Sequence, residues 1–419
     1  MIYKKISPRY IWIIFYIAIN IISLSHILNY NSLVGETSGV SIIDTTPIIA
    51  IGILVLSSYL FILGPVFNSF YKLPANWLPR TFSTAESGRD LGIILLFLQL
   101  GFIVLIISDG SFIAGSTLRS GSLWSQFFVL FPVDTIFFLY YGFYRKNKMF
   151  MPNMVLTIIS NLLRGWIGII STLVILESMR LMRNKKLSIS KIIFYIVGIS
   201  FIFPLIQSIK LVLRASATDL NIKYSDLIIE IFDLDKLTDL FSNSFNIISD
   251  RLQIISHNIV SFQSSDLLNY IYESDQILPF WLEGIHGVAF YRLIGSELPD
   301  NIGIQFGKLL DPSNVDVNWN VNPGLFVWWF MDPFLGILYS IYILFILYMT
   351  ISLVKSIHAN TPETSDVIWF SWLAFLMPGW TGSIYLFFHA TLLFYLCHFI
   401  GGIFINKPSL KTRLNSRSA

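Results

Sequence analysis

The chain alternates long apolar runs with short polar segments, and this pattern covers most of its length. An α-helix needs roughly twenty apolar residues to cross a bilayer core of about 30 Å. The runs that we expect to form membrane helices are residues 10–28, 47–67, 91–108, 126–144, 149–163, 166–179, 192–213 and 325–355, and two more within 367–405. The pattern therefore predicts an all-α polytopic membrane protein with about 10 (10–12) transmembrane helices.

Two places leave the helix count open. The run 149–163 would reach only roughly 22 Å, and Arg164, Gly165 and Trp166 follow it. These residues predict a turn between two short helices, with Arg164 near the outer face. One long tilted helix with a snorkelling arginine is the alternative, but it would place two basic clusters on opposite sides of the membrane. The last run, 367–405, is interrupted at residues 378–382, where we expect a break between two helices.

Composition agrees with the membrane interpretation. The 419 residues are 54% hydrophobic and 13% charged, about half the charge of a soluble domain. The net charge of +3 gives no indication of nucleic-acid binding. The single cysteine, Cys397, excludes an internal disulfide and a thiolate metal cluster.

Lysine and arginine predict the orientation of the helices. Basic residues gather before the first apolar run, in the loops around residues 72–89, 145–148 and 180–186, and after residue 406. The positive-inside rule places these segments, and both termini, in the cytoplasm. The first run is too long for the apolar region of a cleaved signal peptide, so we expect it to be a retained helix.

One long polar stretch, residues 210–323, interrupts the apolar pattern. It predicts a large helical loop outside the cytoplasm, region 214–323, within a single transmembrane domain that spans residues 1–419. Within it, residues 221–255 have apolar positions at helical spacing, which predicts one or two amphipathic helices on the membrane face or over the helix bundle.

Several cations lie where this topology does not require charge. Unpaired arginines near a bilayer are costly, so several at one face indicate an anion between them. The candidate cations are Arg164, Lys210, Arg214, Arg251 and Arg292. Asp250 and His257 lie close to Arg251 in the sequence. His257 has no cysteine or carboxylate at ligand spacing, so we expect no metal there, and a plain surface histidine is the alternative interpretation.

Aromatic and acidic residues add weaker candidates. Trp281, Tyr291 and Trp319 belong either to an interfacial aromatic belt or to stacking platforms for sugar rings. Further polar candidates are Glu283, His286 and Asp332. Asp134, beside Pro132 within an apolar run, has no obvious partner in the sequence, and we interpret it as a hydrogen-bonded structural acid.

Three local patterns and the overall layout resemble the Wzy-type O-antigen polymerases and, more distantly, the O-antigen ligases. The patterns are Leu162-Leu163-Arg164-Gly165-Trp166, Ser256-His257-Asn258, and Asn322-Pro323-Gly324-Leu325 through Pro333-Phe334-Leu335-Gly336. The chain departs from the family at Leu163, where a serine is usual, at Trp328 and Trp329, where an acidic residue is common, and at His257, which lies in the middle of the loop.

The resemblance implies a GT-C-like fold in the bacterial inner membrane and an undecaprenyl-pyrophosphate-linked oligosaccharide as substrate. The reaction would transfer the growing glycan to a sugar hydroxyl of an incoming repeat unit in lipopolysaccharide biosynthesis. Arg164, Lys210, Arg214 and Arg292 would bind the pyrophosphate, with Arg251 stabilising its charge. His257 would accept the hydroxyl proton, with Asp250 as the substitute base.

The resemblance also bears on partners and cofactors. It implies a chain-length regulator protein as a partner. No glycine-rich phosphate loop, metal-binding carboxylate pair or cofactor motif is apparent, so we expect a reaction without metal or cofactor. Two alternatives stay open, an O-antigen ligase and, in a different class, a lipid-linked oligosaccharide flippase or transporter.

Overall fold

The computed structural model describes residues 7–75, 77–81, 85–109, 112, 122–166, 168–184, 249–312, 320–357 and 361–405. Most of these residues are helical, and β-pairing within them is limited to isolated bridges. The first helices along the chain are α1 (Pro8–Tyr30), η1 (Gly35–Thr37), α2 (Ile48–Phe61), η2 (Ile62–Val66), α3 (Phe67–Lys72), α4 (Ala85–Asp109), α5 (Leu123–Leu130), α6 (Val133–Tyr144), α7 (Phe150–Leu163) and α8 (Gly168–Arg183).

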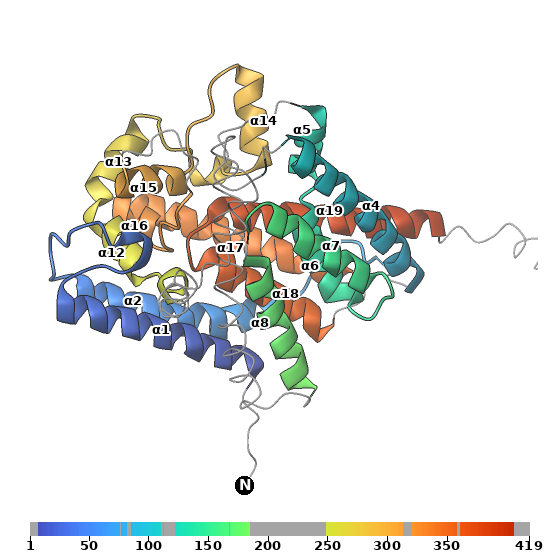
Figure 1. Ribbon diagram of the computed structural model, residues 1–419, viewed down its shortest axis with the longest axis horizontal. Coiled ribbons are helices and arrows are strands. Elements are labelled where there is room, and N and C mark those ends of the chain that lie inside the picture. Colours follow the sequence, from blue (N-terminus) through green and yellow to red (C-terminus); the bar gives the residue numbers. More distant parts are fainter. Residues whose placement is uncertain are drawn as a thin grey trace, which may run out of the picture.

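The second half of the described chain begins within the long polar stretch (Figure 1). Its helices are α12 (Ile255–Gln263), α13 (Ser265–Glu273), η3 (Phe280–Leu282), α14 (Ile285–Ile294), α15 (Ile302–Leu310), α16 (Val327–Met331), α17 (Pro333–Ser356), α18 (Pro362–Ser371), η4 (Trp372–Leu376) and α19 (Thr381–Ile405).

Six helical segments within the described ranges are long and apolar enough to cross a membrane, which identifies a polytopic membrane protein. They are Pro8–Thr37, Ile48–Lys72, Glu86–Asp109, Leu123–Tyr144, Pro333–Ser356 and Thr381–Gly401. The expected helices at 149–163 and 166–179 correspond to the shorter α7 and α8. The expected helix at 192–213 lies outside the described residues.

The two expected interruptions are present, and glycine explains both. α7 ends in a Schellman turn, in which the N–H of Trp166 donates to the carbonyl of Asn161 and Gly165 has a φ of +71°. The alternative of one continuous helix across Arg164 is therefore wrong. Gly379 forms the same turn after η4, and α19 begins two residues later.

Proline shapes two of the other membrane helices. Pro65 lies inside the π-helical turn η2, between α2 and α3. Pro132 separates α5 from α6. Proline has no N–H to donate to the helix ladder, so the chain widens or breaks at these positions.

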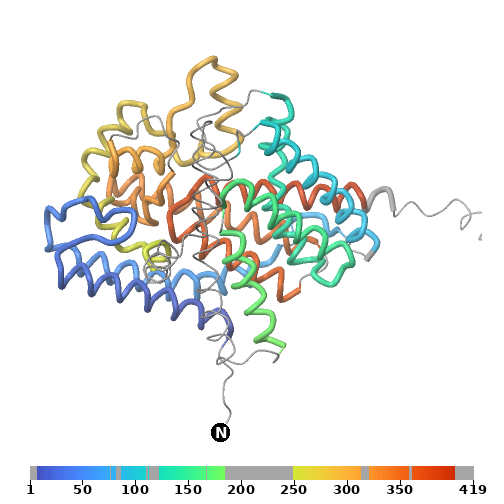
Figure 2. Tube along the Cα trace, in the orientation of Figure 1, coloured from blue at the N-terminus to red at the C-terminus, as the bar shows by residue number. Residues whose placement is uncertain are grey.

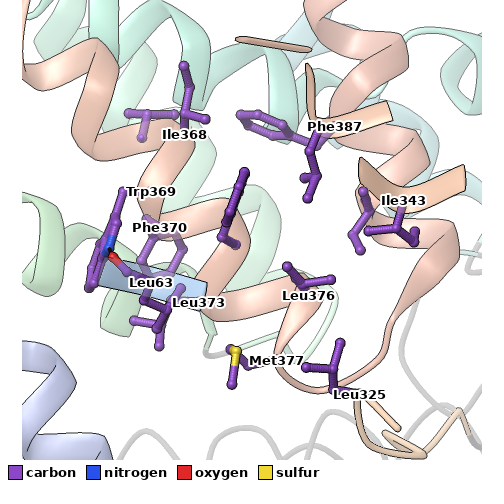
Figure 3. Close-up of a cluster of buried hydrophobic side chains, with 14 of the residues drawn as sticks. Leu63, Leu325, Ile343, Ile368, Trp369, Phe370, Leu373, Leu376, Met377 and Phe387 are labelled. Atoms are coloured by element: carbon purple, nitrogen blue, oxygen red, sulfur yellow. Dashed lines mark hydrogen bonds between the residues drawn. The ribbon is translucent and has the colours of Figure 1, made fainter. Parts of the chain in front are cut away.

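The core lies where α17, α18 and α19 pack together with η2 and η4. Figure 3 shows large apolar side chains from these elements meeting, among them Ile343, Trp369 and Phe387. The indole N–H of Trp369 donates to the carbonyl of Leu63 at 2.9 Å, so this buried polar group is satisfied as well. These contacts hold together helices that lie far apart in the sequence.

Charged residues meet at one end of the bundle. Arg9 and Arg183 both pair with Asp366, which is 2% exposed, and Glu177 pairs with Arg145 and Arg180 at 2.6 Å each. The ends of α1, α6, α8 and α18 are thereby joined. The four arginines all belong to segments that the charge pattern places on the same side of the membrane.

The long polar stretch covers the other end, and we call its described part, residues 249–312, the cap. Figure 2 shows the loop after α1 lying beside the start of the cap. The hydroxyl of Ser256 accepts the N–H of Val34 at 3.3 Å, and the amide oxygen of Asn20 accepts the N–H of Ile254 at 3.0 Å. The first loop and the long loop therefore lie on the same side of the bundle.

Candidate functional site

A buried carboxyl group joins the cap to the membrane helices. Glu283 follows η3, and its side chain reaches the first turn of α19, where Oε2 accepts the N–H of Gly382 at 3.1 Å. Glu283 is only 5% exposed, and burial raises its pKa to about 8. The N–H groups of Ile302 and Gly382 lower this pKa in part, but desolvation is the larger effect.

Further polar and aromatic groups surround Glu283, and we call this set the Glu283 site. It consists of Glu283, His286, Tyr339, Tyr342, Thr381 and Tyr385. Tyr339 and Tyr342 lie on α17, close enough to interact electrostatically with the carboxyl group. Phe280 packs its ring against both tyrosines, with centroids 5.4 and 5.6 Å away. The carboxyl group of Glu283 is therefore surrounded by aromatic side chains near the first turns of α17 and α19.

His257 lies inside the cap and not on its surface. All residues of α12 from Ile255 to Ser261 are buried, and His257 is 1% exposed. Neither ring nitrogen has a hydrogen-bond partner among the described residues. Burial lowers the pKa of His257 to about 4, so the ring is neutral at neutral pH. The alternative interpretation of a surface histidine is therefore wrong.

Arg251 and Asp250 lie at the edge of the cap. Arg251 is half exposed and pairs with Glu36 at 3.4 Å, which ties the cap to η1. Asp250 is partly buried, which raises the pKa of its carboxyl group. Since Arg251 already has an acidic partner, its charge is partly compensated without any ligand.

Arg164 is buried and paired within the membrane helices. Its guanidinium contacts the carboxylate of Asp134, and it donates to the amide oxygen of Asn161 at 3.0 Å. It also lies over the rings of Phe102 and Trp166, at 5.0 and 4.4 Å from their centroids. Asp134 also accepts a hydrogen bond from Asn161 at 2.9 Å, so it is the structural acid that we expected, and Arg164 is the partner that the sequence did not reveal.

The third described cation lies on the surface of α14. Arg292 is exposed and forms no ion pair with a described residue. Trp281 and Tyr291 come from the same short segment, and both are partly exposed. Figure 1 shows α14 at the top, away from α12 at the left and α7 at the right. Trp281 and Glu283 thus lie just before α14, while Tyr291 and Arg292 lie in its last turns. The structure does not bring Arg164 or Arg251 to this segment.

The remaining candidates have local roles or lie elsewhere. Asp332 is the N-cap of α17, since it accepts the N–H groups of Phe334 and Leu335 at 2.6 and 3.1 Å. His286 contacts the carbonyl oxygen of Trp281 through Nε2. Lys210, Arg214 and Trp319 lie outside the described residues, as does most of the expected amphipathic region 221–255.

Searches of family models, curated proteins and solved structures give no match to this chain.

The two buried titratable groups of the cap predict opposite pH effects on stability. Between about pH 4.5 and 8, folded Glu283 keeps a proton that the unfolded chain has lost, so its contribution to stability falls as pH rises. Between about pH 6.5 and 4, the unfolded chain binds a proton at His257 that the folded chain does not, so stability falls as pH drops. Thermal unfolding midpoints in detergent, measured from pH 4 to 9, test both signs.

Conservative variants assign each effect to its residue. We expect Glu283→Gln to gain stability relative to the wild type as pH rises from 5 to 8. We expect His257→Gln to gain relative stability as pH falls from 6.5 to 4. A stability difference that does not change with pH, for either variant, would contradict the burial of that group.

Proposed function

We propose that this protein is a glycosyltransferase of the bacterial inner membrane that elongates a lipid-pyrophosphate-linked glycan, as an O-antigen polymerase does. The growing glycan is transferred from its undecaprenyl pyrophosphate to a sugar hydroxyl of an incoming repeat unit. The reaction takes place at the outer end of the bundle, where the cap meets α17 and α19. No metal or cofactor has a part in this proposal.

The observation that carries the proposal is the free charge of Arg292. Of the three candidate cations in the described residues, Arg164 and Arg251 are paired with Asp134 and Glu36, while Arg292 has no described acidic partner. A guanidinium without a partner can bind phosphate oxygens through forked, charge-assisted hydrogen bonds. Among these three cations, we therefore assign the binding of the pyrophosphate to Arg292.

The surroundings of Arg292 suit a lipid-linked substrate. Leu293 is 86% exposed, and Phe290 and Ile294 are also exposed on α14. Exposed apolar side chains beside a cation are typical of a helix that lies at the surface of a bilayer and contacts lipid headgroups. Trp281 and Tyr291, in the same segment, are available for contact with sugar rings.

The length of the surface glycan tests the proposal in a deletion strain. We expect the deletion to leave glycan of a single repeat unit. Complementation with the wild type should restore the ladder, and Arg292→Ala should restore only short chains, since the leaving pyrophosphate would lose its counter-charge. Arg89→Ala is the matched control, because Arg89 is also an exposed arginine but pairs with its neighbour Asp90, and it should restore the full ladder.

Two results would contradict this function. Loss of all attached glycan on deletion would indicate the ligase alternative, because a ligase joins the chain to its lipid acceptor. A normal ladder in the deletion strain would exclude both polymerase and ligase and favour a different class of protein.

A further inference from the structure

Three buried polar groups with incomplete hydrogen bonding belong to the Glu283 site. Oε1 of Glu283 has no well-formed hydrogen bond to a described residue, and the hydroxyls of Tyr339 and Thr381, which lie within reach of each other, do not form one either. Tyr339 and Thr381 are each 2% exposed. Buried polar groups are nearly always satisfied, because an unpaired one costs about 1–3 kcal/mol. Incomplete hydrogen bonding of Glu283, Tyr339 and Thr381 at one place therefore indicates a small polar group that binds beside them.

The chemistry of the three groups defines what can bind there. A carboxylate accepts hydrogen bonds, while a phenol and an aliphatic hydroxyl both donate and accept. A ligand hydroxyl matches this set, because it donates to the carboxylate and accepts from Tyr339 or Thr381. A cation is less suitable, since residues of the described ranges offer no metal-binding group of His, Cys, Asp or Glu side chains.

Aromatic rings extend from this place to the surface of the cap. Phe280 packs edge-on against Trp281, with ring centroids 4.7 Å apart, and Trp281 is 39% exposed. The ring of His286 also packs against Tyr385, with ring centroids 4.3 Å apart. Aromatic faces attract the polarised C–H groups of sugar rings. The hydroxyl that the three polar groups fit is therefore the hydroxyl of a sugar.

We propose that Glu283, Tyr339 and Thr381 bind the attacking sugar hydroxyl of the acceptor, and that Glu283 takes its proton. The inference rests on the proposed function and adds a catalytic base to it. His257 lies on α12 with its ring against Phe306, and Asp250 lies at the edge of the cap beside η1, so neither belongs to the Glu283 site.

The hydroxyl oxygen of the acceptor attacks the anomeric carbon of the donor glycan and forms the new C–O bond. The bond from this carbon to the pyrophosphate oxygen breaks, and its electron pair leaves with the pyrophosphate, which Arg292 stabilises. The hydroxyl proton passes to the carboxylate of Glu283 and then to water. The amide of Gly382, at the positive end of α19, stabilises the carboxylate before the proton arrives.

The first test is elongation of a lipid-linked oligosaccharide by purified, reconstituted protein. We expect Glu283→Gln to lower the rate by at least about 10²-fold, and Glu283→Asp to retain part of the activity. Tyr339→Phe, which keeps the ring packed on Phe280, should lower the rate by about 10-fold. Glu297→Gln removes an exposed carboxylate from the same cap segment and should leave the rate unchanged. Size-exclusion profiles in detergent verify that each variant is folded.

The second test needs no glycan. Dicyclohexylcarbodiimide reacts with protonated carboxyl groups in apolar surroundings, so it should label the peptide that carries Glu283 at pH 6 and label it less at pH 9. The labelling should be absent from Glu283→Gln. The wild-type elongation rate should rise through about pH 8 as Glu283 ionises, with a flat profile for Glu283→Gln. The other ionisable groups facing Glu283 from α14, α17 and α19 are His286, Tyr339, Tyr342 and Tyr385.

The outcomes separate this inference from the proposed function. If the wild type elongates the glycan and Glu283→Gln does so at the same rate, or if Glu283 is not labelled, the assignment of Glu283 is overturned and the function stands. If the wild type cannot elongate a lipid-linked oligosaccharide, the proposed function fails.

Discussion

Replacing Asp134 by Ala should destabilise the protein by about 3–5 kcal/mol. Arg164 is 4% exposed, and the substitution would leave its buried charge without an acidic partner. Asn161 would still accept one hydrogen bond, but an amide oxygen cannot compensate a full charge. Reversible unfolding in mixed detergent micelles measures the loss.

Two further variants show whether the pair itself is responsible. Asp90→Ala removes the acid of an exposed pair, Arg89 with Asp90, and should change stability by no more than about 0.5 kcal/mol. The double variant Asp134→Leu with Arg164→Met should recover more than half of the loss, because no buried charge remains. A double variant as unstable as Asp134→Ala would show that the ion pair is not the cause.

Replacing Gly379 by Ala should lower the stability of the protein about as much as Asp134→Ala does. Gly379 has a φ of +80°, which costs an L-residue about 1–2 kcal/mol. A Cβ there would lie 2.3 Å from the carbonyl oxygen of Gly324 and 2.7 Å from its carbon, and these are backbone atoms that cannot rotate away. The N–H of Gly324 donates to Pro378 at 2.9 Å, so both segments would have to separate. We expect a loss of about 3–5 kcal/mol.

Gly295 provides the matched control. It ends α14 in the same kind of turn, with a φ of +68°, and a Cβ there would meet no atom within 4 Å. Gly295→Ala should therefore cost only the backbone term, about 1 kcal/mol. Equal losses for the two variants would show that the contact with Gly324 does not matter. Thermal unfolding of both variants in one detergent makes the comparison.

Local pattern predicted the elements of the fold well. Apolar length predicted the six spanning segments, and the glycines at 165 and 379 predicted the turns, because both signals depend on residues close together in the sequence. The number ten is not established, since α7 and α8 are short and residues 192–213 lie outside the described ranges.

Partners across helices were much harder to predict. Asp134 and Arg164 are 30 positions apart on different helices, and spacing along one helix cannot reveal such a pair. The same limit affects the candidate site. Arg292, Trp281 and Tyr291 are visible in the sequence because they share one short segment. The burial of Glu283 against α17 and α19 depends on distant parts of the chain, so its neighbours in the sequence do not indicate it. His257 has a polar neighbourhood in the sequence, which suggested exposure, but in the structure it is buried together with Ser256 and Asn258.

The contact between Arg9 and Asp366 has a consequence for biogenesis. The two residues are 357 positions apart. At about 5–20 residues per second, a ribosome needs roughly 20–70 s to make the chain between them. During that interval the first helix has been made, but Asp366, the carboxylate partner of Arg9, has not yet been synthesised. The nascent chain thus passes through a stage in which the charge of Arg9 is not yet compensated by Asp366.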